Sequence, residues 1–265
     1  MNTNETLIEI INHIINKHPE LSSHIESLAA LSLGKGFNSL DKSTEVNSLK
    51  KFLTSEPLLA IDIGANVGDY STALISEFPS INIHTFEPSA TNIEILYKRF
   101  ENNPKIKIIP KAISTISGVT KLFSDNPGSG MASLTKRNLS HFNISFDCEE
   151  SIETISFNEY YLHNIPNQII DIVKIDIEGH ELQALQSFGS SITHTRVIQF
   201  EFGGTHIDSR NYFRDFWDFF EKNNFSLFRI TPYGHIKIKE YNERDECFIS
   251  MNYIATNNKL TNFSN

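Results

Sequence analysis

The stretch that decides the fold of this chain reads Leu58-Leu59-Ala60-Ile61-Asp62-Ile63-Gly64-Ala65-Asn66-Val67-Gly68-Asp69. It begins as a short apolar run, which is typical of a buried strand. The run ends at Gly64, Gly68 follows, and apolar residues at helical spacing continue over 70–75. Glycines let a ligand approach the backbone closely, and a helix N-terminus offers free N–H groups. The stretch therefore predicts a strand, a glycine-rich turn and a helix that together can cradle a nucleotide.

The spacing within this turn is Asp-x-Gly-x-Asn-x-Gly, which differs from the Gly-x-Gly-x-x-Gly of dinucleotide-binding enzymes. It resembles motif I of class I methyltransferases that use S-adenosylmethionine (SAM). The resemblance implies that the turn curls around the amino-acid half of SAM and binds no pyrophosphate. The alternative is a tight strand–helix turn that binds no ligand.

A second acidic residue, Glu87, follows the apolar segment 81–86, which we expect to be the next strand. Pro88 would stop this strand, and Ser89 can cap the helix that follows. A carboxylate at this position can accept hydrogen bonds from both hydroxyls of an adenosine ribose. We therefore expect Glu87 to bind a ribose, the alternative being a solvated turn residue.

The composition narrows the class of protein. The chain has 265 residues and a formal net charge of −9 at pH 7, which suits one α/β domain with additions. The acidic balance argues against nucleic-acid binding, which needs clustered Lys and Arg. Cys148 and Cys247 lack the spacing of metal ligands and are interpreted as reduced thiols. With no apparent signal peptide and no apolar run long enough to cross a bilayer, we predict a cytoplasmic protein.

The segments on either side of the central turn suggest the domain organisation. Residues 1–56 are predicted to form a helical cap, whose first helix carries an apolar stripe that could pack on the main domain or form a homodimer. From 58 to 113, strands alternate with helices as in a doubly wound parallel sheet, the third strand being predicted at 106–113. The alternation stops at about 119–157, where we predict an insertion of hairpins and loops that shapes a substrate site.

Five further strands are predicted, at 169–176, 196–202, 225–230, 235–239 and 247–255. The last two would include a reversed edge hairpin, and a sheet order of 3-2-1-4-5 would make the first and fourth strands neighbours. The prediction is an α/β, Rossmann-like fold with a mostly parallel seven-stranded sheet. This domain would span 57–256 and end in a flexible tail at 257–265.

Three acids and a histidine crowd the end of the fourth strand, in the sequence Asp176-Ile177-Glu178-Gly179-His180-Glu181. Open α/β sheets bind ligands at this edge. Asp176 could hold the ammonium group of the cofactor or a substrate hydroxyl, and it is also a candidate catalytic residue. Glu178 and Glu181 are candidates for substrate binding, although acids in a first helical turn can also serve as caps. His180 is a candidate general base, the alternative being a structural role.

A second cluster, Glu201-Phe202-Gly203-Gly204-Thr205-His206, ends the fifth strand and would face the same edge. Glu201 and His206 are the other candidates for the base. His206 is preferred, because its loop is glycine-flanked and polar and its ring can point into the cleft. The acceptor is expected between 124–147 and 203–210. The acids could bind Mg²⁺ through oxygen ligands, but nothing fixes such a site, and no metal is predicted.

Several of these segments together resemble the FkbM-type family of class I SAM-dependent methyltransferases, most specifically Ile175-Asp176-Ile177-Glu178-Gly179-His180-Glu181. The resemblance covers roughly 57–255 and leaves out the helical cap. It implies methyl transfer from SAM to a hydroxyl oxygen, often on a sugar or polyketide. Asp176 would serve cofactor or substrate, and the positions implied to contact the cofactor are Asp62, Gly64, Ala65, Asn66, Gly68, Glu87 and Ala112.

The leading prediction is thus a SAM-dependent O-methyltransferase acting on a hydroxyl of a sugar or another glycan or natural product. One alternative is an N- or carboxyl-methyltransferase on the same fold. Another is a binding or scaffold protein that keeps the fold without catalysis, and the intact glycine turn with Glu87 argues against it. A nucleic-acid methyltransferase is disfavoured by the net charge and by the lack of an Asn-Pro-Pro-Tyr-like motif or paired catalytic cysteines.

Overall fold

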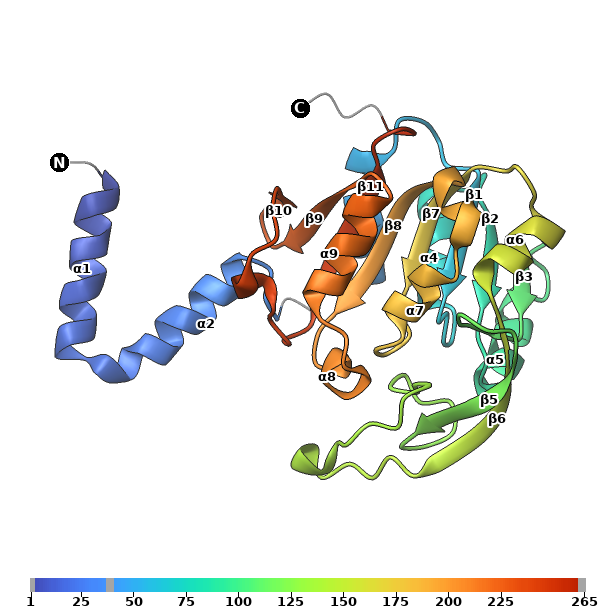
Figure 1. The fold of residues 1–265 in the computed structure, drawn as a ribbon, viewed down its shortest axis with the longest axis horizontal. Helices are drawn as coiled ribbons and strands as arrows, with labels where there is room; N and C mark the ends of the chain where they lie inside the picture. The colour runs from blue at the N-terminus through green and yellow to red at the C-terminus, as the bar shows by residue number, and fades with distance from the viewer. Residues whose placement is uncertain (1–2, 37–40, 262–265) are drawn as a thin grey trace.

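The computed structural model describes residues 3–36 and 41–261. At its centre is an eight-stranded sheet with helices on both faces (Figure 1). The strands are β1 (Leu59–Ile63), β2 (Asn82–Phe86), β3 (Ile106–Ile109), β7 (Ile170–Ile175), β8 (Thr195–Phe202), β9 (Phe225–Thr231), β10 (Gly234–Ile238) and β11 (Met251–Asn257). Their order in space is β10-β9-β11-β8-β7-β1-β2-β3, and the strands from β8 to β3 are parallel. The predicted order 3-2-1-4-5 and the α/β, Rossmann-like fold are confirmed.

The sheet has one strand more than the seven predicted, and its reversed strand is not at the edge. β11 lies between β8 and β9 and is antiparallel to both. All its residues are buried, which suits an internal position, whereas β10 is mostly exposed. The edge hairpin therefore consists of β9 and β10, paired from Gly234 opposite Thr231.

The helices of the body are α3 (Lys42–Leu49), α4 (Asp69–Glu77), α5 (Ala90–Phe100), α6 (Phe157–Asn164), α7 (Glu181–Gln186), α8 (Thr205–Ser209) and α9 (Phe213–Lys222). One face of the sheet packs against α3 and α4 through a cluster that includes Ala60 and Ile172. The other face packs against α6, α7 and α9 through a larger cluster that includes Ile61 and Ile63. Because helices cover both faces, β1 is buried throughout, and it is apolar except for Asp62.

The insertion forms a second, smaller sheet beside the main one. Its strands are β4 (Ala112–Ile113), β5 (Gly118–Ser124) and β6 (Cys148–Ile155), in the order β4-β6-β5. The strand predicted to run from 106 to 113 is split between the two sheets at Pro110, which has no N–H to donate to a ladder. The loop 125–147 joins β5 to β6 and extends below the carboxyl ends of the parallel strands (Figure 1).

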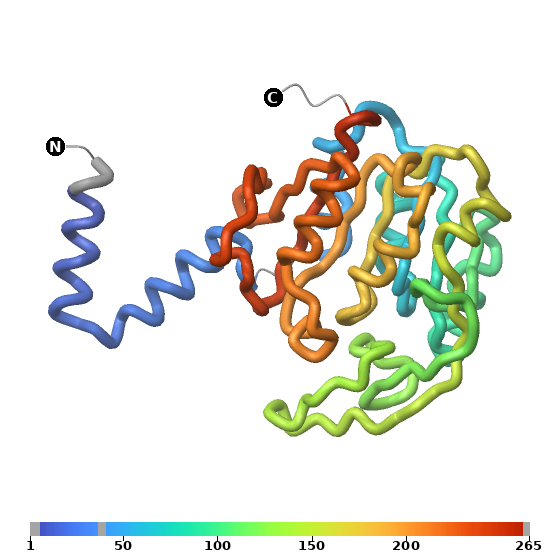
Figure 2. Tube along the Cα trace, viewed as in Figure 1, coloured from blue at the N-terminus to red at the C-terminus, as the bar shows by residue number. Residues whose placement is uncertain are grey.

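The first two helices, α1 (Thr3–Lys17) and α2 (Ser22–Ser32), form an arm that projects away from the body (Figures 1 and 2). Only α3 of the predicted helical cap covers the sheet. The arm meets the body just after α2, where Gly34 has φ +81° and an added Cβ would lie 2.1 Å from the carbonyl oxygen of Ile230. Leu7 and Ile8 of the arm are 56% and 58% exposed. The apolar stripe of α1 therefore does not pack on the main domain.

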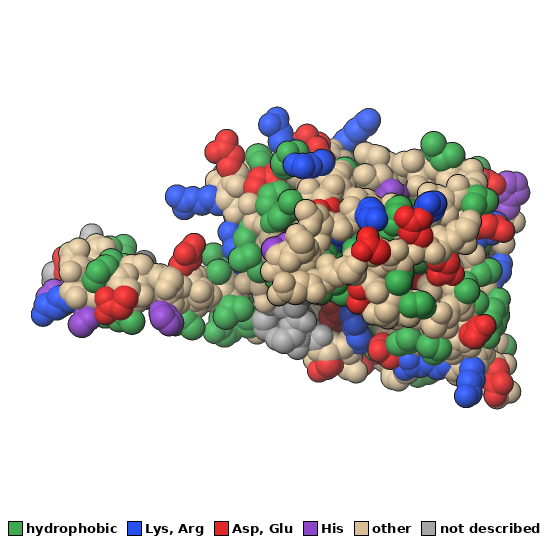
Figure 3. All heavy atoms as spheres, turned by 90° about the horizontal axis from the view of Figure 1, so that it is seen from below, with side chains coloured by type: hydrophobic (Ala, Val, Ile, Leu, Met, Phe, Trp, Pro, Cys, Tyr) green, Lys and Arg blue, Asp and Glu red, His purple; other side chains and the backbone are tan. Residues whose placement is uncertain are grey.

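The end of the chain differs in part from the predicted tail. Asn257 is the last residue of β11 and Thr261 is buried, while 262–265 lie outside the described residues. Seen from below, acidic and basic side chains are interspersed over the body (Figure 3). Within 3–36 and 41–261, none of the helices combines the length and the apolar character that crossing a bilayer requires.

Candidate active site

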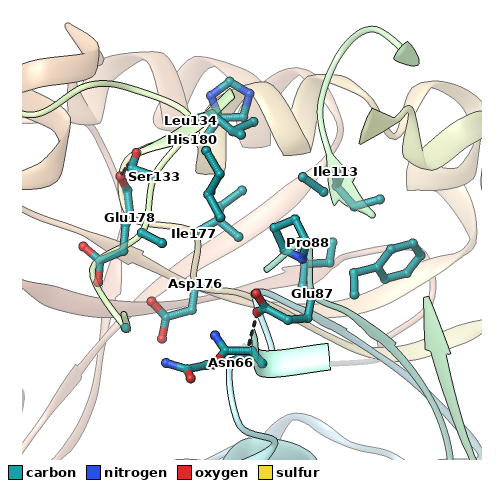
Figure 4. A pocket seen from close by; sticks show the side chains of 18 of the residues that line it. Asn66, Glu87, Pro88, Ile113, Ser133, Leu134, Asp176, Ile177, Glu178 and His180 are labelled. Atoms are coloured by element: carbon teal, nitrogen blue, oxygen red, sulfur yellow. Dashed lines mark hydrogen bonds between the residues drawn. The ribbon is translucent and has the colours of Figure 1, made fainter. Parts of the chain in front are cut away.

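A cavity opens at the carboxyl ends of β1, β2 and β7 and encloses about 560 Å³, including its open mouth. Asp176 and Glu178 lie on one side of it, and Glu87, Pro88 and Ile113 lie on the other (Figure 4). The residues around it that were predicted to contact cofactor or substrate are Gly64, Asn66, Glu87, Ala112, Asp176, Glu178 and His180.

The turn after β1 is held against the neighbouring strand ends by its own backbone. The N–H groups of Gly64 and Ala65 both donate to the carbonyl oxygen of Phe86, over 3.0 and 3.1 Å. Gly64 has φ +85°, and an added Cβ would lie 2.0 Å from the carbonyl oxygen of Asp176. Only glycine fits this position without a shift of the backbone. The turn therefore brings main-chain atoms to the floor of the cavity.

Glu87 joins the end of β2 to this turn. Its Oε2 accepts a hydrogen bond of 2.8 Å from the N–H of Asn66, and its Oε1 accepts one of 2.9 Å from the N–H of Ser89. The side chain is 6% exposed, and burial raises the pKa of its carboxyl to about 7. The carboxyl group lies at the cavity wall beside Asn66 (Figure 4). It can therefore accept further hydrogen bonds from a ligand.

Asp62, Ala65 and Gly68 do not line the cavity. Asp62 is 1% exposed and its Oδ2 accepts a hydrogen bond of 2.6 Å from the hydroxyl of Ser71 in α4. Burial raises the pKa of Asp62 to about 6, against the effect of the Ser71 hydroxyl. Gly68, at φ +89°, faces Phe100 of α5. Asp62 and Gly68 thus support the turn through contacts inside the protein, and the cofactor contacts expected of all three residues stay predictions.

Asn92 is a lining residue that sequence reasoning missed. It is 2% exposed, in the first turn of α5, and lies near Glu87. Its Oδ1 has no hydrogen-bond partner among the described residues. A buried acceptor without a partner is costly, so a donor group on a ligand would fit here. Ala112 and Ile113 supply apolar surface to the same cavity.

Asp176 and Glu178 supply the acidic side of the cavity (Figure 4). Asp176 Oδ2 lies 3.5 Å from Nζ of the buried Lys174. Glu178 has φ +54°, and its Oε2 accepts a hydrogen bond of 3.0 Å from Arg137 Nη1. Burial, followed by the charge of Asp176, raises the pKa of Glu178 to about 8. The nearby charge of Arg137 opposes this rise in the pKa of Glu178.

His180 forms the wall opposite Asp176 in this view, close to Leu134 (Figure 4). Its Nε2 lies 3.1 Å from the hydroxyl oxygen of Ser114. Burial lowers the pKa of the imidazole below its usual value. His180 is therefore neutral at neutral pH and can accept a proton.

The structure does not place Glu181 and His206 in the cavity, contrary to their predicted roles in substrate binding and proton removal. Glu181 accepts hydrogen bonds of 2.9 Å from the N–H groups of Ile177 and Gly179, and its Oε2 lies 3.0 Å from His206 Nε2. Both side chains are at most 1% exposed. This pair joins two loops inside the protein. His206 consequently cannot reach an acceptor without local unfolding.

Glu201 also lies outside the cavity lining. Its carboxyl accepts a hydrogen bond from the hydroxyl of Ser250. Burial, followed by the charge of Asp176, raises the pKa of Glu201 to about 7. Glu201 therefore contributes to the electrostatic field around Asp176. Because it lies outside the cavity lining, it is not our first candidate for the base.

The long loop 125–147 is fixed next to the mouth of the cavity. Arg137 lies between Glu178 and Asp208 of α8, and its Nε is 3.7 Å from Asp208 Oδ2. Ser133 donates a hydrogen bond of 2.8 Å to the carbonyl oxygen of Glu178. These contacts bring the two segments expected to flank the acceptor, the loop and α8, to the same side of the cavity. In the part of the chain that the structure describes, no group of three His, Cys, Asp or Glu residues could hold a metal ion.

Comparisons with known proteins agree with the resemblance noted in the sequence. The model of the methyltransferase FkbM domain matches residues 62–227. The methyltransferase sdnD of Sordaria araneosa is 25% identical over 159 residues, which cover 51% of this chain and 61% of that protein. The chain thus spans less than two thirds of that relative.

Two solved structures also resemble the chain. One is the O-methyltransferase from Bacillus cereus in complex with SAH, with a TM-score of 0.45, 9% identity and coverage of 94% of this chain and 97% of that one. The other is the plantazolicin methyltransferase BpumL in complex with SAH, with a TM-score of 0.45, 10% identity and coverage of 91% and 90%. Likeness at this level says nothing about the reaction of this chain.

Proposed function

The chain belongs to the FkbM methyltransferase family, and we propose that it transfers a methyl group from SAM to a hydroxyl oxygen of a sugar or another glycan or natural product. The observation that carries this proposal is the buried Glu87 carboxyl, which holds the N–H of Asn66 at 2.8 Å and also borders the cavity. A carboxylate beside a glycine turn at the carboxyl edge of a parallel sheet suits the ribose of a nucleoside cofactor.

The residues around the cavity fit SAM in three respects. Glu87 would accept hydrogen bonds from the ribose hydroxyls. Asn92 offers a buried Oδ1 that lacks a partner in the described chain, beside the apolar surface of Ala112 and Ile113, which suits the adenine side. The Gly64 turn leaves no room for a side chain and exposes its main chain, and the Asp176 carboxylate next to it suits an ammonium group.

When bound, SAM supplies an electrophilic methyl group on a sulfonium. The protein must align the acceptor oxygen with this methyl group and remove the hydroxyl proton. We assign proton removal to His180, because its imidazole is neutral at neutral pH and lines the cavity. Glu178, with its pKa raised to about 8, would hold the acceptor by a hydrogen bond. Asp176 would serve the cofactor.

Binding and labelling experiments distinguish the proposed O-methyltransferase from a scaffold protein and from an N- or carboxyl-methyltransferase. A scaffold protein would bind neither SAM nor SAH in calorimetry, and a micromolar SAH affinity would favour the enzyme. Incubation with methyl-labelled SAM and fractionated extracts of the source cell then identifies the acceptor. Label that is stable to mild base and resides on a carbohydrate or polyketide oxygen would support the proposal. Label on an amine, or label lost in mild base as a methyl ester, would support N- or carboxyl-methylation.

We also propose that the arm formed by α1 and α2 makes a homodimer. Its exposed apolar residues, including Leu7, Ile8 and Leu28, would be covered by the same arm of a second copy. Light scattering after size-exclusion chromatography tests this, since a chain without residues 1–33 should be monomeric. The cytoplasmic location stays a prediction from the sequence.

A further inference from the structure

Helix α3 lies outside residues 62–227, yet it reaches the cavity through a group of charged side chains. Lys42, at its first position, places Nζ 3.8 Å from Asp176 Oδ2, and Asp176 lines the cavity. Glu45, one turn later, is buried at 3% exposure. Its carboxylate oxygens lie 3.3 Å from Lys42 Nζ and 3.8 Å from Lys174 Nζ. The charges therefore run from α3 through β7 to the acidic side of the cavity.

Lys174 and Lys42 differ in what they can do. Lys174 is 2% exposed and is surrounded by Asp176, Glu45 and Asn252, whose Oδ1 is 3.4 Å from Nζ. Burial favours the neutral amine, but the carboxylates of Asp176 and Glu45 outweigh it and raise the pKa of Lys174 above its usual value. Lys174 is thus a fixed internal cation. The side chain of Lys42 is 41% exposed, so it can meet a ligand as well as its two carboxylates.

The amino-acid half of SAM carries an ammonium group and a carboxylate on the same carbon. A site for it needs an anion and a cation a few ångströms apart. Asp176 and Lys42 form such a pair, beside the Gly64 turn. We propose, on the basis of the function proposed above, that Lys42 of α3 binds the carboxylate of the cofactor while Asp176 binds its ammonium group. Glu45 acts as a positioning residue that holds both lysines.

The proposal is tested by comparing two ligands that differ in this half alone. SAH carries the amino-acid group, whereas 5′-methylthioadenosine has the same nucleoside and thioether without it. In calorimetry, Lys42→Met should lower the affinity for SAH about ten-fold, as expected for a partly exposed charge-assisted hydrogen bond. The affinity for methylthioadenosine should stay within about two-fold, since ligand groups that never touch Lys42 are unaffected.

Two further variants separate binding from folding. Lys51→Met removes the same charge at an exposed position just after the end of α3. It should leave the affinities for SAH and methylthioadenosine unchanged. Lys42→Arg keeps the charge and should restore most of the SAH affinity. The wild-type affinity for SAH should also fall more steeply with salt than that of Lys42→Met, because exposed charges are screened.

An unchanged SAH affinity in Lys42→Met would overturn the proposal. An equal loss of affinity for both ligands would also overturn it, because the defect would then be structural. Failure of the wild-type protein to bind either ligand is a different result, because it rejects the proposed SAM-dependent function itself. If the wild type binds SAH and Lys42→Met binds it ten-fold more weakly, while Lys51→Met and Lys42→Arg do not, α3 is part of the cofactor site.

Discussion

The Oε2 of Glu87 accepts a hydrogen bond of 2.8 Å from the main-chain N–H of Asn66. This bond joins the end of β2 to the turn after β1. The same carboxyl that we assign to the ribose thus also fixes the backbone that cradles the cofactor. Substitution of Glu87 is therefore expected to affect both the shape of the turn and the affinity for the cofactor, and a cleaner test uses the proton that Glu87 carries.

The first prediction is that cofactor binding releases a proton near neutral pH. Burial raises the pKa of Glu87 to about 7 in the free protein, and ribose hydroxyls donate to the ionised carboxylate. SAH should therefore bind more weakly as the pH falls below about 7 and with constant affinity above it. Calorimetry at pH 6.5 in buffers of different ionisation enthalpy should show proton release. Glu87→Gln should abolish the release, and an unaltered release in this variant would show that another group titrates.

The second prediction concerns Gly64. An added methyl group would lie 2.0 Å from the carbonyl oxygen of Asp176, and the residue has φ +85°. Gly64→Ala should lower the free energy of unfolding by more than about 2 kcal/mol, because backbone must shift in addition to the conformational strain. Urea unfolding measures this. Gly204→Ala is the control, since its added Cβ would meet only the oxygen of Phe248 at 3.4 Å. Equal stabilities of the two variants would contradict the close packing described at Gly64.

The first part of the site could be predicted because its determinants are local in sequence. Strand, turn and helix around Gly64 follow one another, and Glu87 lies at the end of the next strand of the same unit. Since parallel strands end at one edge of a sheet, the strand order alone is enough to place Asp176 beside Gly64. The helix α6 was missed, although Ser156 and Glu159 have the spacing of a capping box and Ser156 accepts a hydrogen bond from the N–H of Glu159.

The part that could not be predicted depends on packing between distant segments. The glycines near His206 suggested a loop free to turn the ring into the cleft. In the structure Gly203 serves close packing, since an added Cβ there would lie 2.6 Å from Ser250 Cα. The approach of Lys42 to Asp176 is likewise a contact between segments that no local pattern relates.

The third prediction is that His206 stabilises the protein and takes no part in catalysis. Its Nε2 lies 3.0 Å from Glu181 Oε2, and both side chains are buried. His206→Ala leaves a buried carboxylate without this partner and should lower the free energy of unfolding by about 1–3 kcal/mol. The turnover of the folded fraction should stay close to that of the wild type. A hundred-fold loss of turnover in a variant of normal stability would restore His206 as the base.

The last prediction identifies the base by its pH profile. When SAM is saturating, the titration of Glu87 in the free protein no longer affects turnover. The pH profile of turnover then reports the groups that act on the bound acceptor. A base must be deprotonated, and turnover therefore rises with pH through its pKa and is constant above. Burial lowers the pKa of His180, so with this base turnover should fall only below about 6.5, the usual value for histidine. His180→Ala should then reduce turnover by about 10²-fold or more with little change in SAH affinity. Burial raises the pKa of Glu178 to about 8. The base is Glu178 if turnover instead rises through about pH 8 and if Glu178→Gln abolishes turnover while His180→Ala does not.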